Sequence, residues 1–284
     1  MKSMYWMFAV CGLVMMTGCS ESKVEVPGTP DGTIVAVAQG LDSNQPEVIW
    51  AALPEKHKKD VKDLIVAFAD QADQDVYEQG FAVFNKAGKL LASKKEFILN
   101  HPMVAAQKES IAPNYDVAVA LFSDIGNSDI KTLEGLKKTD PGTFLADTGS
   151  KVMKKSKEIA KSVAPEAAKN KLDSFSGVKA TVVKSEGDKA TVKVTGADGK
   201  EHEEELTKID GKWLPTDLVE KWDDQIKGAK EAISKYKLTP EQKTQALDAI
   251  KQLDATLDKM LAANSQDEFN AAVGEAMSKA SALP

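Results

Sequence analysis

The sequence contains no arginine: all 37 basic residues among its 284 are lysines. It therefore lacks the planar guanidinium group, which binds phosphate or carboxylate through two parallel hydrogen bonds. The formal net charge is −6, whereas binding of a polyanion needs a concentrated basic surface. The composition argues against recognition of phosphoproteins or nucleic acids, and we expect no nucleic-acid partner.

The sequence also lacks the common motifs of enzymes and cofactor sites. It has no GxSxG motif, no P-loop and no GxGxxG motif. The S-x-x-K spacing occurs at Ser128–Lys131 and Ser234–Lys237, but its companions S-D-N and K-T-G are absent. Asp223 and Asp224 are neighbours on an expected helix and point apart, unlike converging catalytic carboxylates. We therefore predict no catalytic residue and no cofactor, and an enzyme is the less expected outcome.

Histidine is scarce, and its spacing does not indicate a zinc site. His57 lies among lysines, His101 precedes Pro102, and neither belongs to an HExxH motif. His202 and Glu204 share one face of an expected strand and are able to ligate a metal. The alternative is a solvated polar face of an edge strand. We prefer this alternative and predict no metal site.

Only two cysteines are present, Cys11 and Cys19, and both lie near the N-terminus. One lysine precedes Met4–Met16, an uncharged and mostly apolar run of residues. As a helix this run spans about 20 Å, which is short of the ~30 Å hydrocarbon core of a bilayer. It fits the apolar region of a signal peptide, and the small residues Thr17 and Gly18 follow it.

Met16-Thr17-Gly18-Cys19 resembles the lipobox of bacterial lipoproteins, with methionine where the family usually has leucine. The resemblance implies a signal peptide over 1–18, a diacylglycerol on the Cys19 sulfur and usually an acyl chain, such as palmitate, on its amine. Two or three such chains hold a protein at a membrane essentially permanently. The family commonly has aspartate after the cysteine in inner-membrane proteins, whereas here Ser20 follows. This implies the outer membrane, facing the periplasm, if the source has two membranes.

Two other interpretations of this segment stay open: an ordinary secretory signal with a chance cysteine, and a retained membrane helix. Under the lipoprotein interpretation Cys11 leaves with the signal peptide, so Cys19 is the last cysteine. No disulfide then forms, and the fold depends on its hydrophobic core.

The remaining sequence predicts a mainly helical α+β protein. The polar stretch 19–31 contains two prolines and is expected to be a tether, and 32–172 is expected to be helical. Val61, Leu64 and Phe68 form one apolar face of a helix, and Tyr77, Phe81 and Phe84 repeat the spacing. Such aromatic residues can line a ligand pocket, but core packing is the preferred interpretation.

From 173 to 215 the apolar residues alternate with polar ones, and Asp-Gly pairs at 198–199 and 210–211 predict tight turns. We expect an antiparallel meander of three or four strands, with helices covering its apolar face. Residues 189–215 resemble the sheet of nuclear-transport-factor-like domains of small bacterial lipoproteins. That resemblance implies helices wrapped around a curved sheet to form a conical pocket, in a family with both binding proteins and enzymes. It assigns no functional residue here.

Residues 216–284 are expected to form helices that end in a hairpin. Thr239-Pro240-Glu241-Gln242 and Ser265-Gln266-Asp267-Glu268 are both typical of a capping box at a helix N-terminus. Apolar stripes follow both signals, beginning at Leu247 and Phe269. No convincing internal repeat is present.

Five lysines crowd one expected helix: Lys151, Lys154, Lys155, Lys157 and Lys161. A solvated face is the preferred interpretation, and contact with anionic lipid is the alternative.

Three functions remain open. The first is a non-enzymatic, membrane-anchored envelope lipoprotein that binds a partner protein or the cell wall. The second is a periplasmic enzyme whose site carries no recognised motif. The third is a carrier of a lipid or another small apolar ligand between the sheet and the helices.

Overall fold

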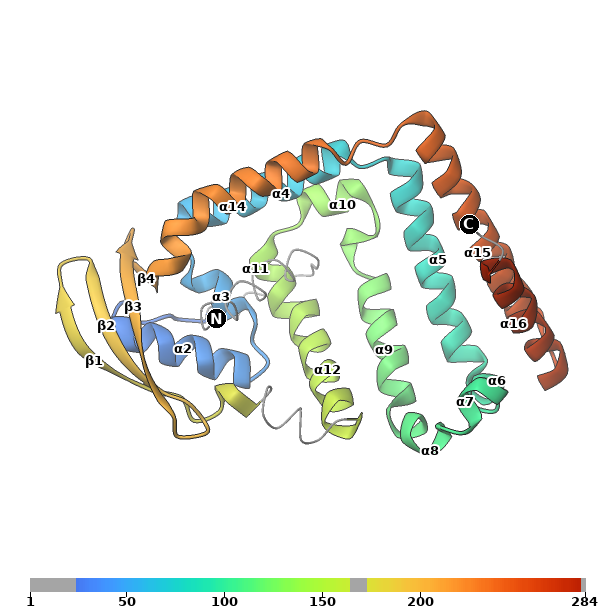
Figure 1. The fold of residues 1–284 in the computed structure, drawn as a ribbon, viewed down its shortest axis with the longest axis horizontal. Helices are drawn as coiled ribbons and strands as arrows, with labels where there is room; N and C mark the ends of the chain where they lie inside the picture. The colour runs from blue at the N-terminus through green and yellow to red at the C-terminus, as the bar shows by residue number, and fades with distance from the viewer. Residues whose placement is uncertain (1–23, 164–172, 282–284) are drawn as a thin grey trace. The chain divides into compact units, whose positions relative to one another are not determined.

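A computed structural model describes residues 24–163 and 173–281 of the chain. The expected signal peptide, the lipobox and Cys19 lie outside the described residues. The structure confirms a predominantly helical α+β protein with one small antiparallel sheet (Figure 1). No helix in these two ranges combines the length and the apolar character that a membrane crossing requires.

The chain divides into two compact units, and helices from distant parts of the sequence contribute to each. Among the described residues, the first unit contains a four-stranded sheet and the α-helices α2 (Pro30–Asp42), α3 (Glu47–Ala52), α4 (Glu55–Gln71), α11 (Pro141–Phe144), α12 (Ser150–Val163) and α14 (Thr216–Ser234), with most of α10 (Leu133–Lys138). The second contains α5 (Gln74–Ser93), α6 (Lys95–Leu99), α7 (Pro102–Ala105), α8 (Lys108–Ile111), α9 (Tyr115–Gly126), α15 (Pro240–Ala262) and α16 (Gln266–Ser281).

The sheet is the expected meander, in the strand order β1-β2-β3-β4. Its strands are β1 (Lys179–Glu186), β2 (Lys189–Thr195), β3 (Glu201–Ile209) and β4 (Lys212–Pro215). Both Asp-Gly turns form: Gly199 has a φ of 75°, and Asp210 and Gly211 have φ of 48° and 79°. Positive φ at two consecutive residues matches the twist of the flanking strands, which explains the tight β3–β4 connection.

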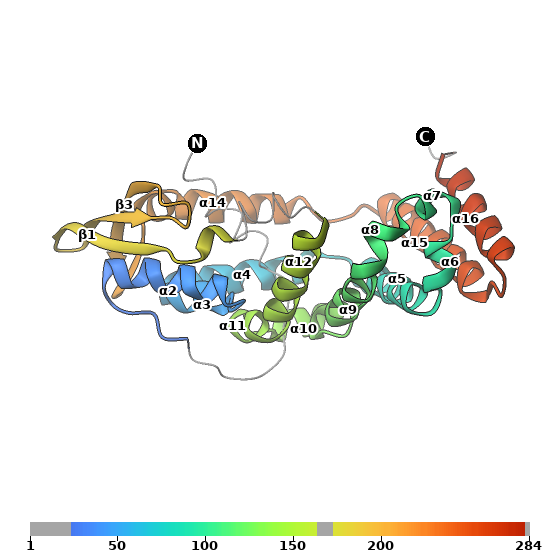
Figure 2. The same ribbon diagram turned by 90° about the horizontal axis from the view of Figure 1, so that it is seen from below.

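Helix α2 covers the apolar face of the sheet, as expected (Figure 2). Ile34 of α2 packs with Val192 and Leu206, which are almost completely buried, and with Trp213 of β4. Every second side chain of a strand points to the same face of the sheet. The apolar residues that recur at every second position therefore form this apolar layer. Side chains therefore fill the space between α2 and the sheet.

The segment before α2 is held against the first unit. Val24 and Val26 pack on a core that includes Leu41 and Val48. The Thr33 hydroxyl donates to the Pro27 carbonyl at 3.0 Å, and the Trp213 indole N–H donates to the Gly28 carbonyl at 3.0 Å. Helix α2 begins at Pro30, with Thr29 as its N-cap. Residues 24–31 of the expected tether are thus attached to the folded body.

In the second unit, α5 lies between α9 and α15 (Figure 1). Phe84 of α5 stacks on Phe122 of α9 with 4.9 Å between ring centroids, and Lys86 forms ion pairs with Asp254 and Asp258 of α15. The aromatic residues at 77, 81 and 84 contact one another in a chain. Helices α15 and α16 form the expected hairpin, and Phe269 of α16 packs on Leu90.

The lysine-rich helix is α12, and one of its side chains has a structural role. The Lys157 ammonium group donates to the carbonyls of Leu41 and Asp42 at 2.7 and 3.0 Å. These carbonyls lie in the last turn of α2, where a helix leaves acceptors unsatisfied and where its dipole favours a cation. Lys157 therefore caps α2.

Candidate functional site

A hollow lies beside the N-terminal segment of the first unit. We call it the Trp50 cleft. It has a volume of about 820 Å³ and is lined by residues 24–27 together with side chains from α3, α4, α11 and β4. This volume lies within the ~300–1,000 Å³ of typical small-molecule sites. The cleft therefore offers room for a short peptide segment or a ligand of similar size.

Trp50 is fixed in the wall of the cleft by its contact with α11. A Cβ atom at Gly142 would lie 2.5 Å from the Trp50 Cδ1 atom and 2.9 Å from Nε1. Only glycine allows the indole to approach the helix backbone this closely, because any other side chain begins with that Cβ atom. The Lys62 ammonium group lies 5.8 Å from the centre of the indole ring, within reach of a cation–π interaction.

Both signs of charge line the cleft. The Glu47 carboxylate is buried, with the residue only 7% exposed, while Lys58 and Lys212 supply positive charge. The Lys58 ammonium group also pairs with Glu55 at 2.8 Å. Asp140 contacts Lys62 at 2.8 Å and accepts the backbone N–H of Thr143 at 3.1 Å. Although burial opposes it, these hydrogen bonds hold the pKa of Asp140 below its ordinary value.

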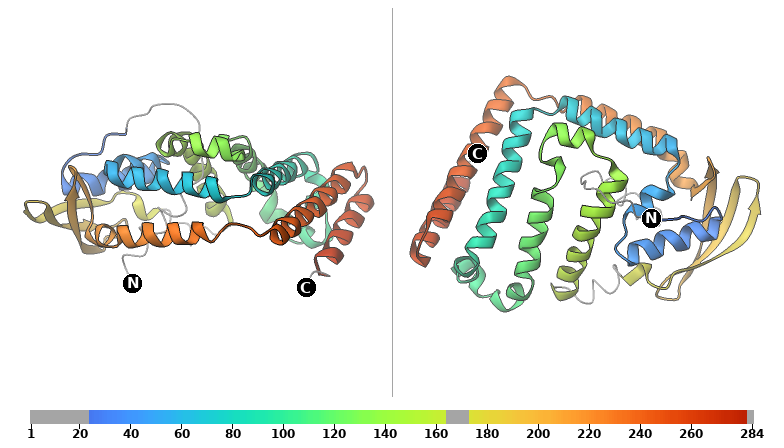
Figure 3. Two further views of the ribbon diagram at one scale, coloured as in Figure 1. Left: turned by 90° about the horizontal axis from the view of Figure 1, so that it is seen from above. Right: turned by 180° about the vertical axis from the view of Figure 1, so that it is seen from behind.

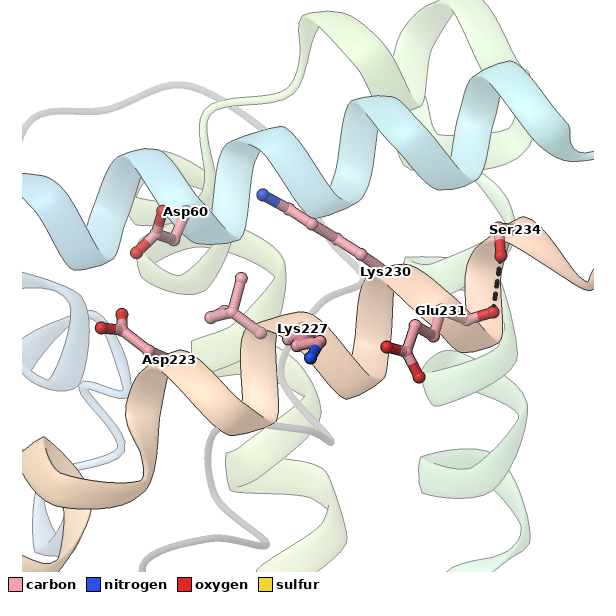
Figure 4. A pocket seen from close by; sticks show the side chains of 7 residues that line it. Asp60, Asp223, Lys227, Lys230, Glu231 and Ser234 are labelled. Atoms are coloured by element: carbon pink, nitrogen blue, oxygen red, sulfur yellow. Dashed lines mark hydrogen bonds between the residues drawn. The ribbon is translucent and has the colours of Figure 1, made fainter.

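A second hollow, the α4–α14 groove, has a volume of about 530 Å³. Its polar lining comprises Asp60 of α4 and Asp223, Lys227, Lys230, Glu231 and Ser234 of α14. Figure 4 shows the Asp60 and Asp223 carboxylates at one end of the groove, with Lys230 extending toward α4. The Lys56 ammonium group bridges the two carboxylates, at 3.0 Å from Asp60 and 2.8 Å from Asp223.

His57 and Trp222 pack on each other where α4 meets α14. Their ring centroids are 4.3 Å apart, and His57 and Trp222 are 4% and 3% exposed. The Trp222 indole N–H donates to the Asp60 carboxylate at 2.9 Å. Although burial opposes it, this bond and the bond from Lys56 hold the pKa of Asp60 below its ordinary value.

Both ring nitrogens of His57 are buried, and neither has a hydrogen-bond partner. Burial, followed by the nearby positive charge of Lys56, lowers the pKa of His57. The imidazole is therefore held in its neutral form. Nothing in the sequence around position 57 predicted this environment, because the ring that buries it comes from position 222.

The structure places the other two histidines in different surroundings. His101 caps α7, since its Nδ1 accepts the backbone N–H of Met103 at 3.3 Å. His202 and Glu204 do share a strand face, and His202 is exposed as expected, but the predicted edge position of the strand was wrong. Strand β3 is an inner strand, and His202 and Glu204 lie opposite Val194 and Val192 on the face that carries the core.

Glu204 lies partly buried on this mostly apolar face. Burial raises its pKa, and His202 acts in the opposite direction. No cluster of three or more histidine, cysteine, aspartate or glutamate side chains able to hold a metal ion occurs in residues 24–163 and 173–281.

The structure also places the S-x-x-K and paired-acid residues. The Ser234 hydroxyl donates to the Glu231 carbonyl one turn earlier at 2.8 Å, as Figure 4 shows. Asp223 points to Lys56, across the α4–α14 groove. These side chains contribute to the end of α14 and to its attachment to α4.

No protein family model, no curated protein and no solved structure matches this chain.

Proposed function

We propose that this protein is a lipid-anchored envelope protein that binds a segment of a partner protein in the Trp50 cleft. In this proposal Cys19 carries the acyl chains, and the body faces the periplasm from the outer membrane where the source has two membranes. The observation that supports it is the course of residues 24–27, which line the cleft themselves.

Few residues separate the proposed anchor, Cys19, from the residues that line the cleft. Val24 is five residues after Cys19, and five extended residues span at most about 18 Å. A lipidated Cys19 would therefore hold the wall of the cleft close to the membrane surface. This reach is much shorter than the ~40 Å that a free tether through residue 31 would allow.

The lining of the cleft fits a peptide segment. Trp50 and Pro27 supply apolar surface, while Glu47 and the two lysines Lys58 and Lys212 supply both signs of charge. Tryptophan is enriched among the residues that dominate protein–protein binding energy, and charges at the border of such a site select the partner. The carrier alternative has no comparable support, because side chains fill the space between α2 and the sheet.

The anchor is tested by the intact mass of the native product and of a Cys19→Ser variant. We expect a mature chain that begins at Cys19, carries two or three acyl chains and fractionates with membranes. The variant should lack this mass and should leave the membrane fraction. An unmodified Cys19, or a leader still attached, would contradict the proposed anchor.

The binding site is tested by photo-crosslinking in the native cell. A photoreactive amino acid replaces Ala51, which lines the cleft, and in a control replaces Val183, which is 56% exposed on β1. We expect one discrete protein adduct from position 51 that is absent from position 183 and weakened by Lys212→Glu. Identical adducts from both positions, no adduct, or an adduct with cell-wall material would each count against the proposal.

A further inference from the structure

The proposed function does not use His57, whose side chain lies at the interface of α4 and α14 without a hydrogen-bond partner. Buried polar atoms in proteins are almost always hydrogen-bonded, because an unpaired buried group forfeits its bonds to water. Here both imidazole nitrogens are buried without a partner, and the ring rests on Trp222. The neutral imidazole packs on Trp222 through the face of its ring. An imidazolium would instead bury two N–H donors without acceptors, together with a positive charge.

Charged groups surround the ring on every element that packs against it. Lys56 and Asp60 lie on α4, Asp223 lies on α14, and Asp210 lies in the β3–β4 turn. The three carboxylates favour the imidazolium and Lys56 opposes it, but burial has the largest effect and favours the neutral ring. Protonation in place is thus penalised, and the penalty is relieved if the ring reaches water.

The surroundings of His57 also hold α14 against α4. The two helices run along each other (Figure 3). Trp222 contributes both the face that covers His57 and the indole N–H that binds Asp60. Beyond these rings the interface opens into the α4–α14 groove, whose lining is charged. Hydration of the imidazole therefore requires displacement of Trp222, and with it the N-terminal half of α14.

We propose that His57 is an acid-sensitive latch: its protonation weakens the attachment of α14 to α4 and widens the α4–α14 groove. At neutral pH the uncharged ring is packed and α14 stays attached to α4. In acid the imidazolium moves into water, Trp222 loses its packing partner, and α14 separates from α4. This latch is independent of the Trp50 cleft and of lipidation at Cys19.

The expected size of the effect follows from proton linkage. In the opened state His57 is solvated and takes an ordinary pKa of about 6.5. The closed state binds fewer protons than the opened state, so acid favours opening. If the ring stays neutral in the closed state throughout, lowering the pH from 7.5 to 5.5 multiplies the opening constant by about tenfold.

The test is hydrogen exchange of the purified full-length protein at pH 7.5 and pH 5.5, corrected for the intrinsic pH dependence of exchange. We expect the protection of α14 and of the first half of α4 to fall by up to about tenfold at the lower pH. His57→Leu and His57→Gln should remove this pH dependence. His101→Gln and His202→Gln are matched controls, since they remove the other two histidines and should leave it intact.

Two results would overturn the latch. One is equal corrected protection of α14 at both pH values, and the other is a loss of protection at pH 5.5 that persists in both His57 variants. If neither His57 variant folds, an NMR titration of the three imidazoles in the wild-type protein decides. The two control variants assign their own signals, so the third signal belongs to His57. It should titrate below the ordinary histidine pKa of about 6.5, and a signal that titrates at or above this value would refute the proposal.

Discussion

The Trp213 indole N–H donates to the Gly28 carbonyl at 3.0 Å, which ties the last strand of the sheet to the segment before α2. These two residues are 185 positions apart in the sequence. Trp213 is only 4% exposed and packs on Ile34 of α2. One side chain thus joins the sheet, the helix that covers it and the N-terminal segment that lines the Trp50 cleft.

Trp213→Phe is expected to loosen residues 24–28 and to destabilise the first unit by about 2 kcal/mol, through the lost hydrogen bond and the smaller ring. Thr33→Val removes the second bond to this segment, from Thr33 to Pro27, and should also loosen it. Thr33→Ser keeps the hydroxyl and serves as the control. Hydrogen exchange of 24–29 measures the effect, and unchanged exchange in Trp213→Phe and Thr33→Val would show that these bonds do not hold the segment.

Gly142→Ala is expected to disturb the Trp50 cleft. The new Cβ atom would lie 2.5 Å from Trp50 Cδ1, so the indole or the helix must shift, at a cost of about 1–3 kcal/mol. Gly228→Ala in α14 is the matched control, because its Cβ atom meets nothing within 4 Å. Alanine should stabilise that helix by roughly 0.5–1 kcal/mol. Chemical denaturation measures the change in unfolding free energy of each variant. A change of the same sign in both variants would contradict this explanation.

The sequence predicted features that depend on neighbouring residues. Asp210 and Gly211 set their own turn, and the Thr239 capping box forms with both of its hydrogen bonds. The second box forms only in part. Ser265 accepts the backbone N–H of Glu268, but the Glu268 carboxylate accepts the N–H of Asn264 instead of that of Ser265. Local signals thus located the helix start to within one residue.

Features that depend on distant residues were missed or misinterpreted. The lysines around His57 indicate a solvated helix face, whereas the imidazole is buried and packs on Trp222 from α14. The polar alternation around His202 and Glu204 indicated an edge strand. Both faces of β3 carry polar residues, however, and its pairing with β2 and β4 was needed to place Glu204 opposite Val192. The Trp50 cleft combines 24–27 with residues near 140 and 212, so no local pattern predicts it.

Glu204→Gln is expected to stabilise the first unit at neutral pH. Burial raises the pKa of Glu204, so the folded state favours the protonated carboxyl group. The stabilisation from this group is present below its unfolded pKa and is lost as the pH rises through the folded pKa. The variant should therefore exceed the wild type in unfolding free energy at pH 7, and the difference should shrink toward pH 4. Glu205→Gln, on the opposite and exposed face of β3, is the control and should show no such pH-dependent gain.

Thr239→Ala is expected to destabilise the start of α15 by about 1 kcal/mol, because it removes the side-chain half of the capping box. The Thr239 hydroxyl accepts the Gln242 backbone N–H at 3.2 Å, and the Gln242 side chain accepts the Thr239 N–H at 2.9 Å. Thr239→Ser retains the acceptor and should stay close to the wild type. Hydrogen exchange in the first turn of α15 measures the effect locally, where unfolding of the first unit does not obscure it. A loss in Thr239→Ser as large as that in Thr239→Ala would mean that the methyl group of Thr239, and not its oxygen, stabilises the helix start.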